Sequence, residues 1–294
     1  MSELSEKIRK LFQEGDDIRD AGLKEPSDVE AFRDICYGTD EKWQSLDVYR
    51  PKTAGREPLP VIVSVHGGAW MYGDKERYRF YCMSLAQRGF AVVNFTYRLA
   101  PENKFPASLE DINLVFTWVL AHKEEYGFDT EHLFAVGDSA GAHNLGLYCC
   151  ILTNPEYAES YAFKTPENFC PRAVALNCGE YHISAEEGSD GSTKEIMKEY
   201  LPEGGTKAEI EKISVIDHVT SAFPPTFLMT AAGDFLIPQA PVMASRLMEC
   251  SVPFELHFYG DADHQLGHVF HCNMKLEEAA KCNDEECAFF RKFI

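Results

Sequence analysis

Apolar positions along this chain form short continuous runs that alternate with segments of helical periodicity. Residues 61–65 and 90–97 are nearly unbroken apolar runs. Residues 107–123 instead carry apolar side chains at helical spacing, namely Leu109, Ile112, Val115, Phe116 and Val119. Continuous apolar strands are typical of parallel sheets that have helices on both faces. The pattern therefore predicts an α/β fold with a mostly parallel central sheet flanked by helices.

The same pattern locates the individual elements. Strands are predicted at residues 45–50, 61–65, 90–97, 133–136, 172–177, 226–230 and 254–259, and helices at residues 78–88, 107–123, 140–152 and 193–200. Residues 1–44 are interpreted as charged amphipathic helices, and residues 180–222 as an insertion rich in Glu, Gly and Ser. At 294 residues, the chain fits a single α/β domain with such additions.

The most informative motif is Gly137-Asp138-Ser139-Ala140-Gly141, directly after the apolar end of a predicted strand. Gly-x-Ser-x-Gly between a strand and a helix forms a strained turn that exposes the serine hydroxyl. The flanking glycines allow the close backbone approach that such a turn requires. Ser139 is therefore a candidate nucleophile, and a buried turn of small residues is the alternative interpretation.

A second motif, His66-Gly67-Gly68-Ala69-Trp70, follows the strand predicted at residues 61–65. Adjacent glycines leave backbone N–H groups uncovered, so these groups can donate to a developing oxyanion. We expect the N–H groups of Gly67, Gly68 and Ala140 to form this oxyanion hole, because Ala140 directly follows the serine. His66 and Asp138 are interpreted as groups that organise the two loops. Together, the motifs indicate serine hydrolase chemistry.

With these motifs in this order, the chain resembles the α/β-hydrolase esterases of the hormone-sensitive-lipase-like and acetyl-esterase group. Residues 97–102, Tyr-Arg-Leu-Ala-Pro-Glu, extend the resemblance, which covers about residues 45–294. Ala69 departs from the family's usual third glycine, and the C-terminal histidine region is longer than usual. The resemblance implies an α/β-hydrolase fold in which residues 1–44 and 180–222 form a lid or acyl pocket. A solvated surface excursion is the alternative for residues 180–222.

The acid and the histidine of a triad should follow the serine in that order. Asp234 ends a predicted strand in Gly-Asp, where the resembling family carries its acid, although a helix cap is the alternative role. Three histidines follow, His264, His268 and His271. We favour His268, because Phe270 could anchor its ring and Gly267 gives the loop room to turn. His264 stays open as an alternative.

Metal chemistry is disfavoured by the same region. His264 and His268 have the i, i+4 spacing of helical metal ligands, but no glutamate stands where a zinc hydrolase needs its base, and Gly267 argues against a helix. The C-terminal cysteines form no Cys-x2-Cys pair. We therefore expect no metal and no cofactor.

The amino-acid composition limits the binding partners and the cellular location that we expect. The 47 acidic and 28 basic residues give a formal charge of −19, which disfavours nucleic acid and anionic membranes as partners. No apolar segment is long enough to span a bilayer, and the charged first ten residues lack the apolar centre of a signal peptide. We expect a cytoplasmic protein with ten reduced core cysteines, acting on a small-molecule ester, and a homodimer stays open.

Three functions fit these features. The leading one is a carboxylesterase for short acyl chains, including acetyl groups on sugars, that works through an acyl-enzyme. The second is an amidase of the arylformamidase type, which His-Gly-Gly-x-Trp and Tyr37-Gly38 also resemble. A non-catalytic relative is the third, and it is disfavoured because Ser139, Asp234 and His268 are all available.

Overall fold

The computed structural model describes residues 2–183 and 191–294, with residues 191 and 192 described by their backbone alone. One eight-stranded sheet runs through this part of the chain in the order β1-β2-β4-β3-β5-β6-β7-β8. The strands are β1 (Val29–Cys36), β2 (Ser45–Pro51), β3 (Leu59–Val65), β4 (Ala91–Phe95), β5 (Phe128–Asp138), β6 (Ala173–Asn177), β7 (Thr226–Ala231) and β8 (Phe254–Tyr259). Strands β3 to β8 are parallel, and β1 and β2 form an antiparallel edge. The prediction of a mostly parallel sheet is confirmed.

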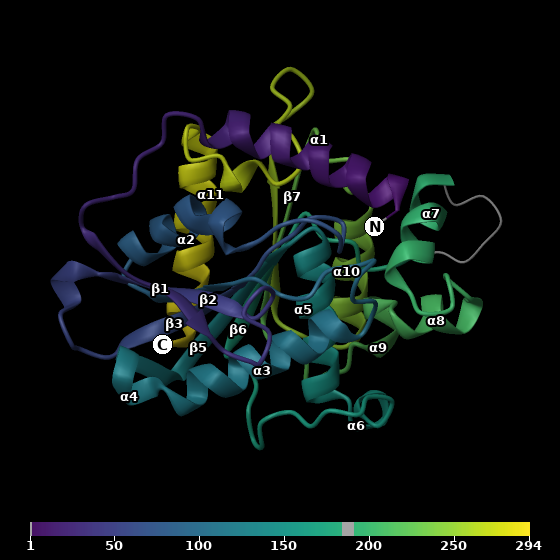
Figure 1. Cartoon of the computed structure of the whole chain (residues 1–294), viewed down its shortest axis with the longest axis horizontal. Helices are drawn as coiled ribbons and strands as arrows, with labels where there is room; N and C mark the ends of the chain where they lie inside the picture. Colours follow the sequence, from purple (N-terminus) through teal and green to yellow (C-terminus); the bar gives the residue numbers. More distant parts are fainter. Residues whose placement is uncertain (1, 184–190) are drawn as a thin grey trace.

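Helices cover both faces of the sheet (Figure 1). They are α1 (Glu3–Asp20), α2 (Lys75–Gln87), α3 (Ala107–Ala121), α4 (Lys123–Tyr126), α5 (Ala140–Thr153), α6 (Pro155–Ala158), α7 (Gly191–Tyr200), α8 (Lys207–Lys212), α9 (Val215–His218), α10 (Gln239–Glu249) and α11 (Glu277–Phe290), with short 3-10 turns η1 (Lys52–Ala54), η2 (Phe270–Cys272) and η3 (Arg291–Phe293). Figure 1 shows α1 lying across one end of the molecule, beside α7.

Two hydrophobic cores follow from the alternation of side chains along the buried strands. In β3, Val61, Val63 and Val65 face the core under α3, α5 and α10, whereas Ile62 faces the core under α2 and α11. Successive side chains of a strand point to opposite faces, so a strand covered on both faces must be apolar throughout. This is the physical reason for the continuous apolar runs.

The N-terminal region departs from the prediction. Residues 1–44 were expected to be helical, but only α1 is a helix, and β1 pairs with β2 in antiparallel register from Val29 opposite Pro51 to Cys36 opposite Ser45. The prediction is wrong for β1 because this edge strand is half exposed and carries charged residues between its inward-facing side chains. The backbone also bulges at Asp34, whose φ is 55°, which interrupts the alternation.

The remaining expectations concern the insertion, the cysteines and membrane spans. Within residues 180–222 the structure has α7, α8 and α9, while residues 184–190 lie outside the described part of the chain. All ten cysteines are free thiols, and Cys36 and Cys170 are exposed, so the expectation that all are core residues is wrong for these two. Among the described residues, no helix combines the length and the apolar character that a membrane crossing needs.

A carboxyl group lies fully buried between α11, α2 and β6. Glu286 accepts a hydrogen bond from the hydroxyl of Tyr81 (3.0 Å) and another from the Nδ2 of Asn177 (2.7 Å). Burial raises the pKa of Glu286 from the ordinary 4.5 to about 7, against the opposing effect of these two donors. The folded protein therefore favours the protonated form of a group that ionises at lower pH in the unfolded chain.

We expect Glu286→Gln to remove a pH-dependent loss of stability. The protonated group stabilises the fold fully below pH 4.5, and this contribution is lost as the pH rises to about 7, at a cost on the order of 3 kcal/mol. The variant should therefore gain stability relative to the native protein between pH 4.5 and 8, measured by urea unfolding. Glu277→Gln, an exposed change on the same helix, is the control. If the difference in unfolding free energy between the native protein and Glu286→Gln did not change with pH, the prediction would be contradicted.

Candidate active site

Ser139 stands between β5 and α5, at a turn that few residues tolerate. Its backbone has φ 51° and ψ −122°, a conformation that costs free energy for a residue with a side chain. A Cβ atom on Gly137 would lie 2.7 Å from the carbonyl oxygen of Gly141, and one on Gly141 would lie 2.1 Å from that of Val65. Both glycines are therefore steric requirements of the turn. The N–H of Ser139 donates to the carbonyl of Asn177 (2.9 Å), which fixes the serine on the neighbouring strand.

A continuous hydrogen-bonded chain joins Ser139, His268 and Asp234. The Nε2 of His268 lies 2.9 Å from the Oγ of Ser139, and its Nδ1 lies 2.7 Å from the Oδ1 of Asp234. Asp234 also accepts from the N–H of Leu236 (2.9 Å) and the hydroxyl of Thr230 (2.8 Å). Burial opposes ionisation of Asp234, but the donors outweigh it and lower the pKa of this carboxyl. Asp234 is thus held as a carboxylate against the imidazole.

An aromatic side chain covers the imidazole of His268. The ring of Phe235 packs on it with 4.2 Å between the ring centroids. Phe270, which we expected in this role, is buried against Tyr259 instead, at 5.3 Å between centroids. The expectation is wrong because Val269 has a left-handed backbone (φ 52°), so the following 3-10 turn directs Phe270 into the core.

The other two candidate histidines lie away from the serine. The side chain of His264 is 63% exposed, and its Nε2 lies 2.8 Å from a carboxylate oxygen of Glu278. His271 is fully buried in η2, and burial lowers its pKa to about 3. Of the three histidines, His268 is the one in hydrogen-bond contact with Ser139.

The expected oxyanion hole needs one correction. The N–H of Gly67 donates to the hydroxyl oxygen of Tyr78 (2.9 Å), so the prediction that Gly67 supplies an oxyanion donor is wrong. Within the described residues, the N–H groups of Gly68, Ala69 and Ala140 donate to no protein atom, and all three residues line the pocket over the serine. Gly68 and Ala69 have φ of 123° and 50°, which turns the loop sharply after Gly67. Ala69 thus adopts the left-handed backbone that glycine would favour at this position.

Two buried titratable groups support the two loops. His66 stacks on Tyr97 with 4.1 Å between ring centroids, and its Nδ1 lies 2.8 Å from the carbonyl oxygen of Gly67. Burial lowers the pKa of His66 to about 4, so its imidazole stays neutral near neutral pH. Burial raises the pKa of Asp138 to about 6, although the hydroxyl of Tyr78 donates to its Oδ2 (2.6 Å). His66 is thus bonded to the backbone of its own loop, whereas the side chain of Asp138 is bonded to the side chain of Tyr78.

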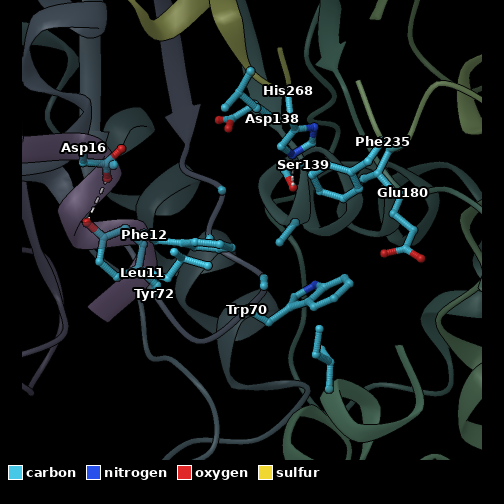
Figure 2. Close-up of a pocket in the computed structure, with 18 of the residues that line it drawn as sticks. Leu11, Phe12, Asp16, Trp70, Tyr72, Asp138, Ser139, Glu180, Phe235 and His268 are labelled. Atoms are coloured by element: carbon cyan, nitrogen blue, oxygen red, sulfur yellow. Dashed lines mark hydrogen bonds between the residues drawn. The ribbon is translucent and has the colours of Figure 1, made fainter. Parts of the chain in front are cut away.

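A pocket of about 520 Å³ opens over the serine. Figure 2 shows the side chains of its two walls, with Leu11, Phe12, Asp16 and Tyr72 on one side of Ser139 and Phe235 and Glu180 on the other. Trp70 closes a further side, where it stacks on Tyr200 (4.9 Å between centroids) and donates from Nε1 to His143 (3.1 Å). α1 supplies its wall from the segment (residues 1–44) that the resemblance led us to expect in a lid or acyl pocket, but the sequence did not single out Leu11, Phe12 or Asp16 as lining residues.

Some side chains could in principle hold a metal ion. Among the described residues, two groups bring three potential ligand atoms within 4.8 Å of one another, Asp138 with His271 and Cys272, and Cys178 with Asp234 and His268. The second group contains the histidine and carboxylate already bonded to Ser139. In the first, the guanidinium of Arg19 acts on both His271 and Cys272, and a fixed positive charge disfavours a second cation there. We assign no metal-dependent step to either group.

Two known proteins similar to this chain are esterases by name. Esterase LipC of Mycobacterium tuberculosis is 29% identical over 74% of this chain and 55% of its own length. The versiconal hemiacetal acetate esterase of Dothistroma septosporum is 28% identical over 71% of this chain and 67% of its own length. The chain therefore spans little more than half of LipC and about two thirds of the second relative.

Solved structures share the fold over nearly the whole chain, and a family model matches about two thirds of it. Esterase B from Lactobacillus rhamnosis, in a complex with a C6-C4 SN3 inhibitor, superposes with a TM-score of 0.88 at 26% identity, over 99% of this chain and 97% of the other. Its complex with a C4-C4 SN3 tributyrin phosphonate is equally similar, with a TM-score of 0.88. The BD-FAE family matches residues 46–248, which include the serine and the acid of the site. The chain therefore belongs to the BD-FAE family, within the α/β-hydrolase esterases.

Proposed function

We propose that this chain is a serine carboxylesterase for short acyl chains, with Ser139 as nucleophile, His268 as general base and Asp234 as the acid that orients it. The observation that carries the proposal is the hydrogen-bonded chain of these three side chains, with Ser139 Oγ 2.9 Å from His268 Nε2. A serine hydroxyl is a weak nucleophile unless an oriented base accepts its proton. The esterase names of the relatives agree with this chemistry.

The reaction would proceed in two steps through an acyl-enzyme. His268 takes the proton of Ser139 as its oxygen attacks the ester carbonyl, and returns it to the leaving alcohol. Asp234 fixes the imidazole tautomer and stabilises the imidazolium. The N–H groups of Gly68, Ala69 and Ala140 would hold the oxyanion, and water would then attack the acyl-enzyme by the same route.

The side chains that line the pocket favour a preference for small acyl groups. Its walls are made by bulky aromatic side chains, including Trp70, Tyr72 and Phe235, which limit the room beside the serine. Trp70 is itself fixed by Tyr200, so this wall cannot retreat without disturbing the core. One relative is named for an acetate ester, and esterase B is complexed with a tributyrin phosphonate. Acetyl groups on carbohydrates therefore belong among the substrates to test.

We expect Ser139→Ala to lower the rate of p-nitrophenyl butyrate hydrolysis by at least about a thousandfold, because the nucleophile is removed. Ser139 is half-buried at the pocket, so the melting temperature should change little. Turnover by the variant close to that of the native protein would contradict the role of Ser139.

The two histidine variants should differ sharply. His268→Ala should abolish labelling of Ser139 by a fluorophosphonate probe, because the hydroxyl loses the base that accepts its proton. His264→Ala is the matched control. Among the described residues, the exposed side chain of His264 hydrogen-bonds to Glu278 alone, so labelling should stay within about twofold of native. Loss of labelling in the control alone would move the catalytic role to His264.

Substrate preference should follow chain length. In a p-nitrophenyl ester series, kcat/KM should be higher for acetyl and butyryl esters than for the decanoyl ester, because the aromatic walls restrict the pocket. The same series should include acetylated xylo-oligosaccharides and N-formylkynurenine. Higher efficiency on decanoyl esters would contradict the short-chain proposal, and a clear preference for N-formylkynurenine would favour an arylformamidase-type amidase instead.

A further inference from the structure

We propose that Tyr78 is a positioning residue of this site, because its hydroxyl joins the oxyanion loop (residues 66–70) to the nucleophile turn (residues 137–141). The inference rests on the proposed esterase function, in which both segments contact the reacting ester. Tyr78 itself comes from α2, an element separate from both segments.

The contacts of the Tyr78 hydroxyl use both of its hydrogen-bonding roles. Its oxygen accepts the N–H of Gly67 (2.9 Å), and its proton is donated to the Oδ2 of Asp138 (2.6 Å). Gly67 immediately precedes Gly68, and Asp138 immediately precedes Ser139. The hydroxyl therefore sets the separation between the residue before the oxyanion donors and the residue before the nucleophile.

The two segments approach each other closely at Gly67. A Cβ atom on Gly67 would lie 2.7 Å from the Oδ2 of Asp138 and 3.1 Å from the Tyr78 hydroxyl. Asp138 is fully buried, and a buried carboxyl without a donor costs free energy. Tyr78 supplies that donor, so loss of its hydroxyl would leave both the Gly67 N–H and the Asp138 carboxyl in need of new partners.

α2 is a rigid support for this hydroxyl. The helix is capped by Asp74, whose side chain accepts the N–H of Arg77 (3.0 Å), and it packs on β2 and β4. The phenol ring of Tyr78 is buried, so its hydroxyl cannot follow a moving loop. Groups held by such an element keep reacting atoms at the required distance better than loop residues do.

The chemical consequence falls on the transition state. Oxyanion donors act at about 2.7–3.1 Å from the developing charge, so a small displacement of Gly68 and Ala69 weakens them. The ground-state ester carries no such charge and depends less on these distances. Loss of the Tyr78 hydroxyl should therefore lower kcat and leave KM nearly unchanged.

Tyr78→Phe tests this role, with Tyr81→Phe as the matched control. Tyr81 lies one turn later on α2 and also donates from a buried hydroxyl to a buried carboxyl, that of Glu286 (3.0 Å). Both variants lose the same kind of hydrogen bond, but in the control the loss does not involve the oxyanion loop. The two variants can therefore lose a similar amount of melting temperature, while only Tyr78→Phe loses a large part of kcat.

The readouts are kcat and KM for p-nitrophenyl butyrate and the Ki of an alkyl trifluoromethyl ketone. The kcat is expressed per active site, counted by labelling to completion with a fluorophosphonate. We expect Tyr78→Phe to lower kcat about 10- to 100-fold, with KM within about twofold, and to raise the Ki by a factor similar to the loss in kcat, because the ketone adduct carries an oxyanion. Tyr81→Phe should keep kcat within about threefold. Equal kcat losses in the two variants, or a change confined to KM, would overturn the inference.

A second pair of variants covers the case in which Tyr78→Phe does not fold. Asp138→Asn keeps an oxygen that can accept from the Tyr78 hydroxyl, whereas Asp138→Ala does not, so the Asn variant should retain more of kcat and bind the ketone more tightly than the Ala variant. Equal values for the pair would overturn the inference. A native protein that hydrolyses no ester in the series would overturn the proposed function as well, which separates the two failures.

Discussion

The site depends on one steric constraint, the turn at Ser139 that presses the start of α5 against the end of β3. A residue with φ of 51° and a side chain is held at a cost of about 1–3 kcal/mol, so its surroundings must fix it. They do so through the N–H of Ser139, which donates to Asn177 on β6, and through the contact of Gly141 with the backbone of Val65 on β3. The turn therefore requires β3, β5 and β6 to be neighbours, which is their order in the sheet. Asp234 and His268 then follow β7 and β8, at the same carboxyl ends of the parallel strands.

The core beside this turn contains two buried carboxyl groups, which the pattern of hydrophobic residues in the sequence does not reveal. Asp138 and Glu286 are both fully buried, and each accepts a hydrogen bond from a tyrosine of α2. Burial raises the pKa of both carboxyls, so neither is a simple contribution to stability. The same Tyr78 hydroxyl accepts the N–H of Gly67, and Glu286 accepts from the side chain of Asn177, whose carbonyl accepts the N–H of Ser139. In the proposed mechanism, α2 therefore contributes to the geometry of the site through Tyr78, in addition to its apolar contacts.

Sequence reasoning succeeded where one local pattern determines the structure. The continuous strands and the Gly-x-Ser-x-Gly turn are readable because burial on both faces and close backbone approach restrict the residue types allowed. It failed where the deciding partner is distant or the burial is partial. The role of Gly67 depends on Tyr78, a residue on another element, and the half-exposed edge strand β1 carries too many charges to show its alternation. Phe235, from the loop after the acid, covers His268 in place of Phe270, and spacing alone could not distinguish them.

The pocket wall made by α1 is tied to the oxyanion loop, although α1 lies outside the alternating part of the chain. Arg9 donates to the carbonyl of Met71 (2.8 Å), and the hydroxyl of Tyr72 donates to Asp16 (2.8 Å). The same loop makes the turn at Gly68, where a Cβ atom would lie 2.0 Å from the carbonyl oxygen of Tyr72. A shift of α1 that widened the pocket would therefore act on the backbone that carries the proposed oxyanion donors. Because of these bonds, we expect the width of the pocket to be coupled to the geometry of the proposed oxyanion hole.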